Sequence, residues 1–130
     1  NKTGALIVIE RNIPLGDVIS GGIELHAAFS KDLILTIFHP DTPLHDGAVI
    51  IRGNQIEAAA CILPLAAGLK HEASLGTRHR AAIGVTEETD AVALIVSEER
   101  GSISLAVGGR ITSSLNEVRL KKVLAAALRK

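Results

Sequence analysis

The stretch GAVIIRGNQIEAAACIL, Gly47–Leu63, decides the fold class of this sequence. It contains two apolar runs, 47–52 and 55–63, which have the length and composition of buried strands. Gly53-Asn54 separates them, and this residue pair favours the positive φ angles of a tight hairpin turn. The stretch therefore predicts two antiparallel strands, and a purely parallel, doubly wound sheet is excluded.

The rest of the chain supplies further strands and several helices. Ser114–Glu117 has the spacing of a capping box and predicts the start of the last helix. Its inner face would hold Leu120, Val123, Leu124 and Leu128. The other predicted elements are strands at 4–10 and 23–29, a helix that Ser30 caps and Pro40 ends, a helix over about 74–89, and a second hairpin from 91–96 and 102–107. We therefore predict one α/β domain over residues 1–130, with a central mixed parallel and antiparallel sheet of six or seven strands flanked by helices.

Composition excludes several classes of protein. The chain has 130 residues, 14 basic and 14 acidic side chains, one cysteine and two aromatic residues. Zero net charge argues against a nucleic-acid coat or a polybasic membrane binder. Scarce aromatics argue against a stacking platform for single strands. A single cysteine excludes an intramolecular disulfide and a cysteine-based zinc site.

No apolar run approaches the ~20 residues of a membrane span, and no secretory signal is visible. Methionine is absent even at position 1. We therefore expect this chain to be a processed or excised piece of a longer protein.

Three short segments place reactive groups beside apolar strands. The first is His45-Asp46-Gly47-Ala48, where a carboxylate lies at the start of a predicted strand. A carboxylate in this place is suited to binding a metal ion or to accepting the proton of a hydroxyl group. Glycine there would let the backbone approach a ligand closely. The alternative, which such short motifs favour, is an ordinary Asp-Gly turn.

The second segment is Gly76-Thr77-Arg78-His79-Arg80, near a predicted helix start. The free N–H groups of a helix N-terminus, a hydroxyl and two guanidinium groups all favour a bound phosphate. Cations in a first helical turn oppose the helix dipole, so an anion would compensate them. A solvated basic face with His79 packed inward is an equally good explanation.

The third segment is Ser97-Glu98-Glu99-Arg100, directly after a predicted strand. Paired carboxylates can bind a divalent cation, although a charged hairpin tip is the commoner role of such a sequence. The three segments together indicate metal-dependent phosphoryl or nucleotidyl transfer. No Walker loop, Rossmann glycine motif or Gly-x-Ser-x-Gly elbow is present to indicate another chemistry.

The sequence resembles the catalytic domain of diadenylate cyclases over its whole length, in particular the membrane-tethered, CdaA-type branch. Two motifs carry the resemblance: Asp46-Gly47-Ala48, and Arg78-His79-Arg80 preceded by Gly76-Thr77. Asp41–Asp46 and Val96–Glu99 match as well. Enzymes of this family condense two ATP molecules into cyclic di-AMP and release two pyrophosphates.

The resemblance implies a role for each motif. Asp46 would bind a divalent cation (Mg²⁺, Mn²⁺ or Co²⁺) and activate or orient the ribose 3′-hydroxyl. His45 and either Glu98 or Glu99 would complete the cation site. The second motif, over residues 77–80, would hold the triphosphate and stabilise charge on the leaving pyrophosphate, so that Arg78, His79 and Arg80 are implied to be catalytic together with Asp46. The residues implied to contact the nucleotide and its phosphates are Gly47, Ala48, Gly76, Thr77, Arg78, His79, Arg80, Ser97 and Glu99.

Adenine would lie against Ile62 and Leu63, with hydrogen bonds from the Leu63 backbone. Related proteins often have tyrosine at the position of Ile62, so adenine affinity is expected to differ here. A non-catalytic adenine-nucleotide sensor is the alternative function.

The resemblance also implies a two-fold homodimer with one ATP on each subunit, because the product is itself two-fold symmetric. No nucleic-acid partner and no direct membrane contact of this domain are expected. The full-length protein is expected to be anchored by N-terminal transmembrane helices, with this domain at the cytoplasmic face of the membrane.

Overall fold

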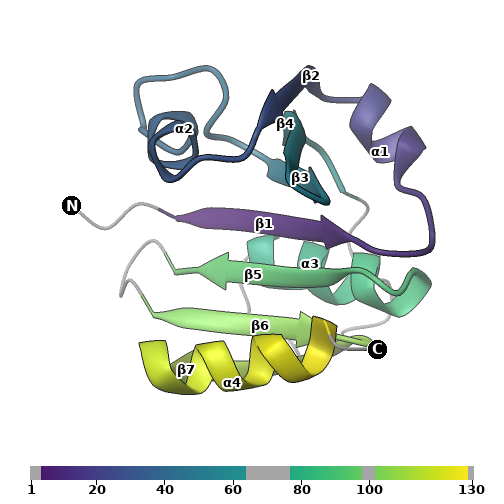
Figure 1. Cartoon of the computed structure of the whole chain (residues 1–130), viewed down its shortest axis with the longest axis vertical. Helices are drawn as coiled ribbons and strands as arrows, with labels where there is room; N and C mark the ends of the chain where they lie inside the picture. The colour runs from purple at the N-terminus through teal and green to yellow at the C-terminus, as the bar shows by residue number, and fades with distance from the viewer. Residues whose placement is uncertain (1–3, 64–76, 98–101, 129–130) are drawn as a thin grey trace.

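The computed structural model describes residues 4–63, 77–97 and 102–128, which form seven strands and four helices (Figure 1). The bounds of these elements in chain order are β1 (Ala5–Glu10), α1 (Gly16–Ser20), β2 (Ile23–Ala28), α2 (Lys31–Ile37), β3 (Ala48–Arg52), β4 (Gln55–Cys61), α3 (Thr77–Glu88), β5 (Val92–Val96), β6 (Ile103–Val107), β7 (Arg110–Leu115) and α4 (Glu117–Leu128).

The strands form one sheet in the order β2-β4-β3-β1-β5-β6-β7. Strands β1 and β3 are parallel, and the other neighbouring pairs are antiparallel. Both predicted hairpins, β3–β4 and β5–β6, are present. The predicted fold class, a single α/β domain with a mixed sheet, is therefore confirmed.

Helices cover both faces of the sheet because the central strands are apolar on both sides. Leu6 and Val8 of β1 belong to the cluster that includes Ala82 and Val85 of α3, and α1 adds residues to the same cluster. On the opposite face, α2 packs on β3 and β4, and α4 packs on β5, β6 and β7. Figure 1 shows α4 in front of the sheet and α3 behind it.

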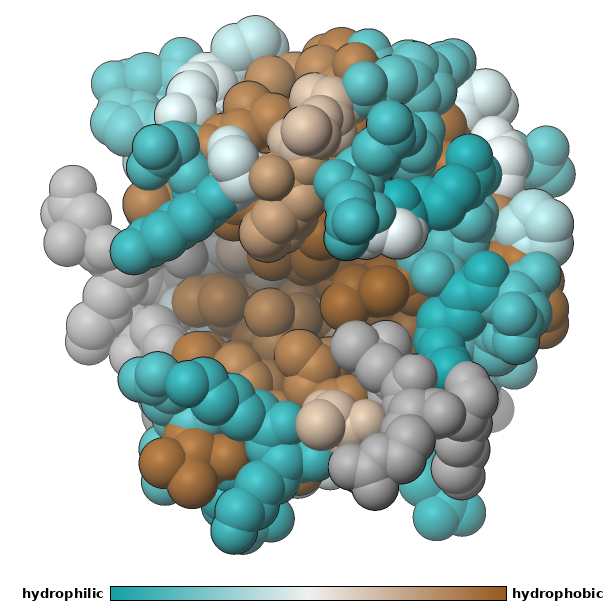
Figure 2. Space-filling model, in the orientation of Figure 1, coloured by the Kyte–Doolittle hydropathy of each residue, from teal (hydrophilic) through white to brown (hydrophobic). Residues whose placement is uncertain are grey.

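Between α2 and α4 the sheet is only partly covered. Ile7, Leu94 and Val96 pack against the buried clusters there but remain partly exposed. Figure 2 shows the apolar surface that results in the middle of this face. Among the described helices, none is both long enough and apolar enough to cross a bilayer.

The start of α4 differs from the prediction. Asn116, rather than Ser114, caps the helix: its Oδ1 accepts a hydrogen bond from the Arg119 N–H at 2.8 Å. Ser114 instead lies in β7. Because Leu115 is buried in the core, the strand continues to that residue and the helix starts two residues later than the capping-box spacing indicates. Leu120, Val123 and Leu124 of α4 face the sheet as predicted. The side chain of Leu128, the fourth residue predicted for this face, is not among those that the structure describes.

A polar network ties the edge strand β2 to the sheet. His26 has a positive φ of 49° at an irregularity in the β2–β4 pairing. Its Nδ1 lies 2.6 Å from Oε1 of the buried Glu57, and its Nε2 lies 2.9 Å from Oε1 of Glu24. Arg52 lies 4.0 Å from Glu57 and is hydrogen-bonded to Glu10. Both ring nitrogens of His26 donate when the ring is protonated.

This network predicts that His26 makes stability depend on pH. Hydrogen bonds to Glu24 and Glu57 raise the pKa of His26 above its ordinary value near 6.5. The contribution of His26 is therefore fully present below pH ~6.5 and is lost as the pH rises through the raised pKa. We expect the Tm difference between the wild type and His26→Gln to shrink from pH 6 to pH 9.

The Tm difference between the two proteins is informative, and the Tm of either one alone is not, because His79 also titrates. Burial lowers the pKa of His79, with a smaller contribution from the Arg78 charge. His79 therefore makes stability rise with pH, opposite to the effect of His26. Any cost of glutamine at the positive φ is independent of pH. A Tm difference that stays constant from pH 6 to pH 9 would show that His26 is not the titrating group.

Candidate active site

Four strands and one helix converge at one end of the sheet, an edge formed by the ends of central strands and not by an outer strand. Parallel β1 and β3 both begin there, and β4 and β5 end there, because Ala48 pairs with Cys61 and Ala5 pairs with Val96. The described part of α3 begins beside the same edge with Thr77. Segments that are far apart in the sequence therefore meet at this point.

A cavity of about 500 Å³ lies at this edge, and we call it the edge cavity. Its size is in the range of small-molecule sites. It is lined by Leu6 of β1, by residues 46–48 and 60–63, and by Thr77, Arg78 and Ala81 of α3. Both motifs predicted to carry the chemistry thus contribute to one cavity.

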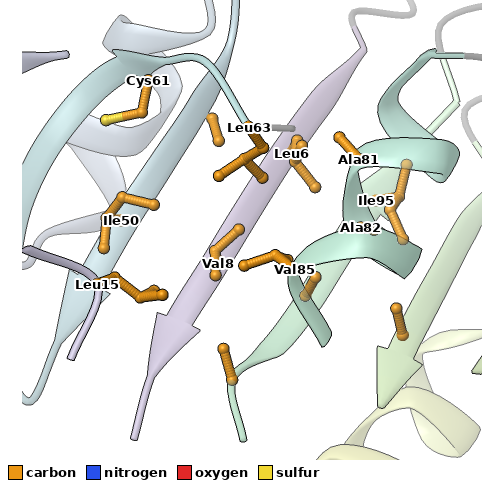
Figure 3. Packing of buried hydrophobic residues seen from close by; sticks show 14 of the residues in the cluster. Leu6, Val8, Leu15, Ile50, Cys61, Leu63, Ala81, Ala82, Val85 and Ile95 are labelled. Carbon is orange, nitrogen blue, oxygen red and sulfur yellow. The ribbon is translucent and has the colours of Figure 1, made fainter. Parts of the chain in front are cut away.

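The floor of the edge cavity is apolar. Leu6, Leu63 and Ala81 are buried in one cluster, and Figure 3 shows Leu6 and Leu63 side by side near Ala81. Cys61 also lines the cavity, but burial raises the pKa of its thiol to about 11. The thiol is therefore protonated at neutral pH and is a poor nucleophile. Ile62 lies at the cavity with its residue surface 83% exposed.

Gly47 is required by packing in the strand pair. Its φ is +103°, and a Cβ atom built on it would lie 2.8 Å from the Cys61 carbonyl oxygen and 2.9 Å from the Ala60 carbonyl carbon. Ala60 itself has a φ of 55°, where the β3–β4 register shifts. The structure thus gives a reason for glycine that differs from the predicted close approach to a ligand: β4 lies too near for any side chain.

Asp46 and His45 lie just before β3. Asp46 is exposed at the edge cavity, so its carboxylate is accessible. His45 is half-buried, and its Nδ1 lies 2.8 Å from the Thr42 carbonyl oxygen. In the neutral ring Nδ1–H donates this hydrogen bond, which leaves the lone pair on Nε2. His45 is not among the cavity-lining residues.

The described residues contain no preformed cluster of three His, Cys, Asp or Glu side chains suited to a metal ion. Glu98 and Glu99, two predicted ligands, lie outside the described residues, as does Gly76. Asp46 and His45 are therefore the members of the predicted cation site whose positions are described, and an oxygen and an imidazole nitrogen suit Mg²⁺, Mn²⁺ or Co²⁺.

The first turn of α3 carries two arginines and contains no acidic residue. Thr77 is exposed and Arg78 is half-buried, and both line the edge cavity. The guanidinium group of Arg78 lies directly against Gly4, the residue before β1. This arrangement brings a positive charge to the end of the cavity where the helix dipole is also positive.

Three other predicted residues lie at the same edge but do not line the cavity. His79 follows Arg78 in α3 and is half-buried. Arg80 has a buried Nε with no hydrogen-bond partner among the described residues. Ser97 follows β5, and its N–H donates to the Ser102 carbonyl oxygen at 2.8 Å.

The sequence analysis missed part of the cavity floor and the residue that lies against the Arg78 guanidinium group. Leu6, Cys61 and Ala81 were predicted only as parts of core elements, because apolar residues in a strand or helix carry no signal that distinguishes a cavity from the core. Gly4 was predicted only as the start of a strand. Its contact with Arg78 depends on the placement of α3 against β1, which the sequence pattern does not specify.

The chain matches the model of a known family. The family model DAC, described as "DisA bacterial checkpoint controller nucleotide-binding", matches residues 1–111. The chain therefore belongs to the DAC family, and the resemblance inferred from the two motifs is confirmed.

Individual relatives indicate which members of the DAC family this chain is similar to. The chain is 50% identical over 129 residues to the cyclic di-AMP synthase CdaA of Bacillus subtilis. The match covers 99% of this chain but 47% of that relative, so the chain spans about half the length of such relatives. A double mutant of DacA from Staphylococcus aureus superposes with a TM-score of 0.92 at 44% identity, covering 97% of this chain and 84% of that one. A hypothetical membrane spanning protein from Bacillus cereus matches with a TM-score of 0.83 at 48% identity, covering 88% and 56%.

Proposed function

We propose that this domain is a diadenylate cyclase, which condenses two ATP molecules into cyclic di-AMP and releases two pyrophosphates. The observation that carries the proposal is the edge cavity, where Asp46-Gly47-Ala48 and Thr77-Arg78 meet although about 30 residues separate them. The names of the curated relatives, such as cyclic di-AMP synthase, support the same reaction.

The cationic end of the edge cavity would hold the triphosphate. Arg78, Thr77 and the N–H groups at the start of α3 offer charge-assisted donors to phosphate oxygens. In this proposal Gly76, His79, Arg80 and Ser97 extend the phosphate site. The buried Nε of Arg80 has no hydrogen-bond partner in the part of the chain that the structure describes, and this supports the assignment, since an anionic oxygen would satisfy it.

The apolar end would hold adenine. Leu6, Leu63 and Ala81 provide a buried apolar surface, and the exposed Ile62 would cover the base with aliphatic contact only. The backbone of Leu63 would hydrogen-bond the base, and the backbones of Gly47 and Ala48 would lie along the nucleotide.

Asp46 would orient the ribose 3′-hydroxyl and accept its proton as the hydroxyl attacks the α-phosphate of the other ATP. We assign the cation site to Asp46, to Nε2 of His45 and to Glu98 or Glu99. A divalent cation bound there would neutralise charge on the phosphates. The remaining catalysis is positioning by the phosphate-binding residues.

The reaction requires two nucleotides, whereas the edge cavity gathers one set of phosphate-binding residues. We therefore propose that two subunits face each other with two-fold symmetry, so that each 3′-hydroxyl lies in line with the α-phosphate held by the partner. ATP and a second copy of the chain are the proposed partners, without nucleic acid.

We also propose that the full-length protein is anchored in the membrane with this domain at the cytoplasmic face. Two observations support this placement. The Bacillus subtilis relative is about twice as long as the present chain, and the Bacillus cereus relative is described as membrane spanning. ATP is a cytoplasmic substrate.

Incubation of the domain with ATP and Mg²⁺, Mn²⁺ or Co²⁺ tests the proposal, with product detection by chromatography and mass spectrometry. We expect cyclic di-AMP and pyrophosphate, formed at a rate that rises faster than linearly with protein concentration. ATP binding without product under all three metals would favour the nucleotide sensor. Absence of both product and ATP binding would contradict either function.

A further inference from the structure

Gly4 and Arg78 are in direct contact across the edge of the sheet. A Cβ atom built on Gly4 would lie 2.5 Å from Nη1, 2.6 Å from Cζ and 3.0 Å from Nη2 of Arg78. All three atoms belong to the guanidinium group, so the charged head of Arg78 occupies the space that any side chain at position 4 would need. Gly4 is itself buried, and the same arginine lines the edge cavity.

We propose that Gly4 is a positioning residue for Arg78. The missing side chain at position 4 creates the space in which the guanidinium group rests, and this rest position sets how far the group reaches into the phosphate end of the edge cavity. The inference rests on the proposed function, because it assigns Arg78 to a nucleoside triphosphate.

The contact differs from those of other tightly packed glycines in the described chain. At Gly47 an added Cβ would meet backbone atoms of β4, and at Gly22 it would meet backbone atoms and a buried thiol of β4, so the fold itself would have to shift. At Gly109 the nearest atoms belong to the Glu87 side chain, but the φ of +84° strains any L side chain there. At Gly4 the three nearest atoms are the far end of a flexible side chain, and the backbone of Gly4 does not require a positive φ. Alanine at position 4 would therefore move the guanidinium group while the fold is retained.

The test compares Gly4→Ala with the matched control Gly16→Ala. A Cβ atom at Gly16, in α1, would meet no atom within 4 Å. We expect Gly4→Ala to lower kcat/KM and ATP affinity about 10- to 100-fold, since a displacement of about 1 Å can cost that much. We expect Gly16→Ala to leave both unchanged. The Tm of Gly4→Ala should remain within a few degrees of the wild type.

A double-mutant cycle with Arg78→Ala separates positioning from a general structural effect. If Gly4 acts through Arg78, adding Gly4→Ala to Arg78→Ala causes no further loss of ATP affinity. An equal further loss in that background would overturn the inference. Unchanged activity and affinity in Gly4→Ala would overturn it too, and so would unfolding of that variant, because the fold would then require glycine there.

The experiment also distinguishes failure of this inference from failure of the proposed function. ATP affinity is measured without turnover, so the cycle can be completed if the wild-type domain binds ATP and makes no product. In that case the cyclase proposal fails, while the role of Gly4 is still decided by the affinities of the four proteins.

Discussion

Replacing Asp46 with asparagine is expected to lower the rate of cyclic di-AMP formation at least about 10³-fold, near the upper range for loss of general acid–base catalysis. Asparagine has nearly the same shape but carries no negative charge and cannot accept the 3′-hydroxyl proton. ATP should still bind measurably, because the phosphate-binding residues of α3 and the apolar floor are unchanged. The measurements are product formation by chromatography and ATP affinity by calorimetry.

Asp41→Asn is the matched control for this variant. Asp41 belongs to the same loop, its side chain is 91% exposed, and it does not line the edge cavity. The same loss of charge at Asp41 should leave the rate within about two-fold of the wild type, as expected for an exposed charge. Wild-type turnover in Asp46→Asn would show that the role assigned to Asp46 is wrong.

Replacing Gly47 with alanine is expected to destabilise the domain by about 2–5 kcal/mol, which combines backbone strain with overpacking against β4. The φ of +103° disfavours any L side chain, and the new Cβ would lie 2.8 Å from the Cys61 carbonyl oxygen. For a domain of this size the Tm should fall by about 10 °C or more. Thermal unfolding monitored by circular dichroism measures this effect directly.

Gly53→Ala isolates the contribution of backbone conformation. Gly53 also has a positive φ, +60°, but a Cβ atom there would meet nothing within 4 Å. This variant should lose about 1 kcal/mol, which is the cost of the left-handed conformation alone. If the two variants were equally stable, the close approach of β4 to Gly47 would be without energetic consequence.

Local sequence patterns predicted most of the fold because their causes are local. The Gly53-Asn54 turn joins two strands as predicted, and Ser30 caps α2 by accepting a hydrogen bond from the Leu33 N–H at 3.0 Å. The exception at Ser114 has a tertiary cause. The capping-box spacing is correct there, but burial of Leu115 in the core extends β7 through that position.

The candidate site was harder to predict because its assembly is not local. The residue types around Asp46 and Arg78 indicated phosphate and cation chemistry separately, and each also had an ordinary structural explanation. Their meeting in one cavity follows from the parallel pairing of β1 with β3 and from the start of α3 at the same edge. Pairing partners of that kind are not encoded in short motifs, so the resemblance to a family was needed to connect them.

The central place of β1 in the sheet has a consequence for folding. Among the seven strands of this sheet β1 comes first in the chain, yet it must pair with β3 on one side and with β5 on the other, where Ala5 meets Val96, 91 positions further along. The β3–β4 and β5–β6 hairpins close short loops and can form early, whereas β1 closes the longest loop in the sheet and slows the final step. The edge cavity exists only after β1 has joined the two halves. ATP should therefore bind only after folding is complete. It should stabilise the native state selectively over any intermediate that contains the hairpins alone.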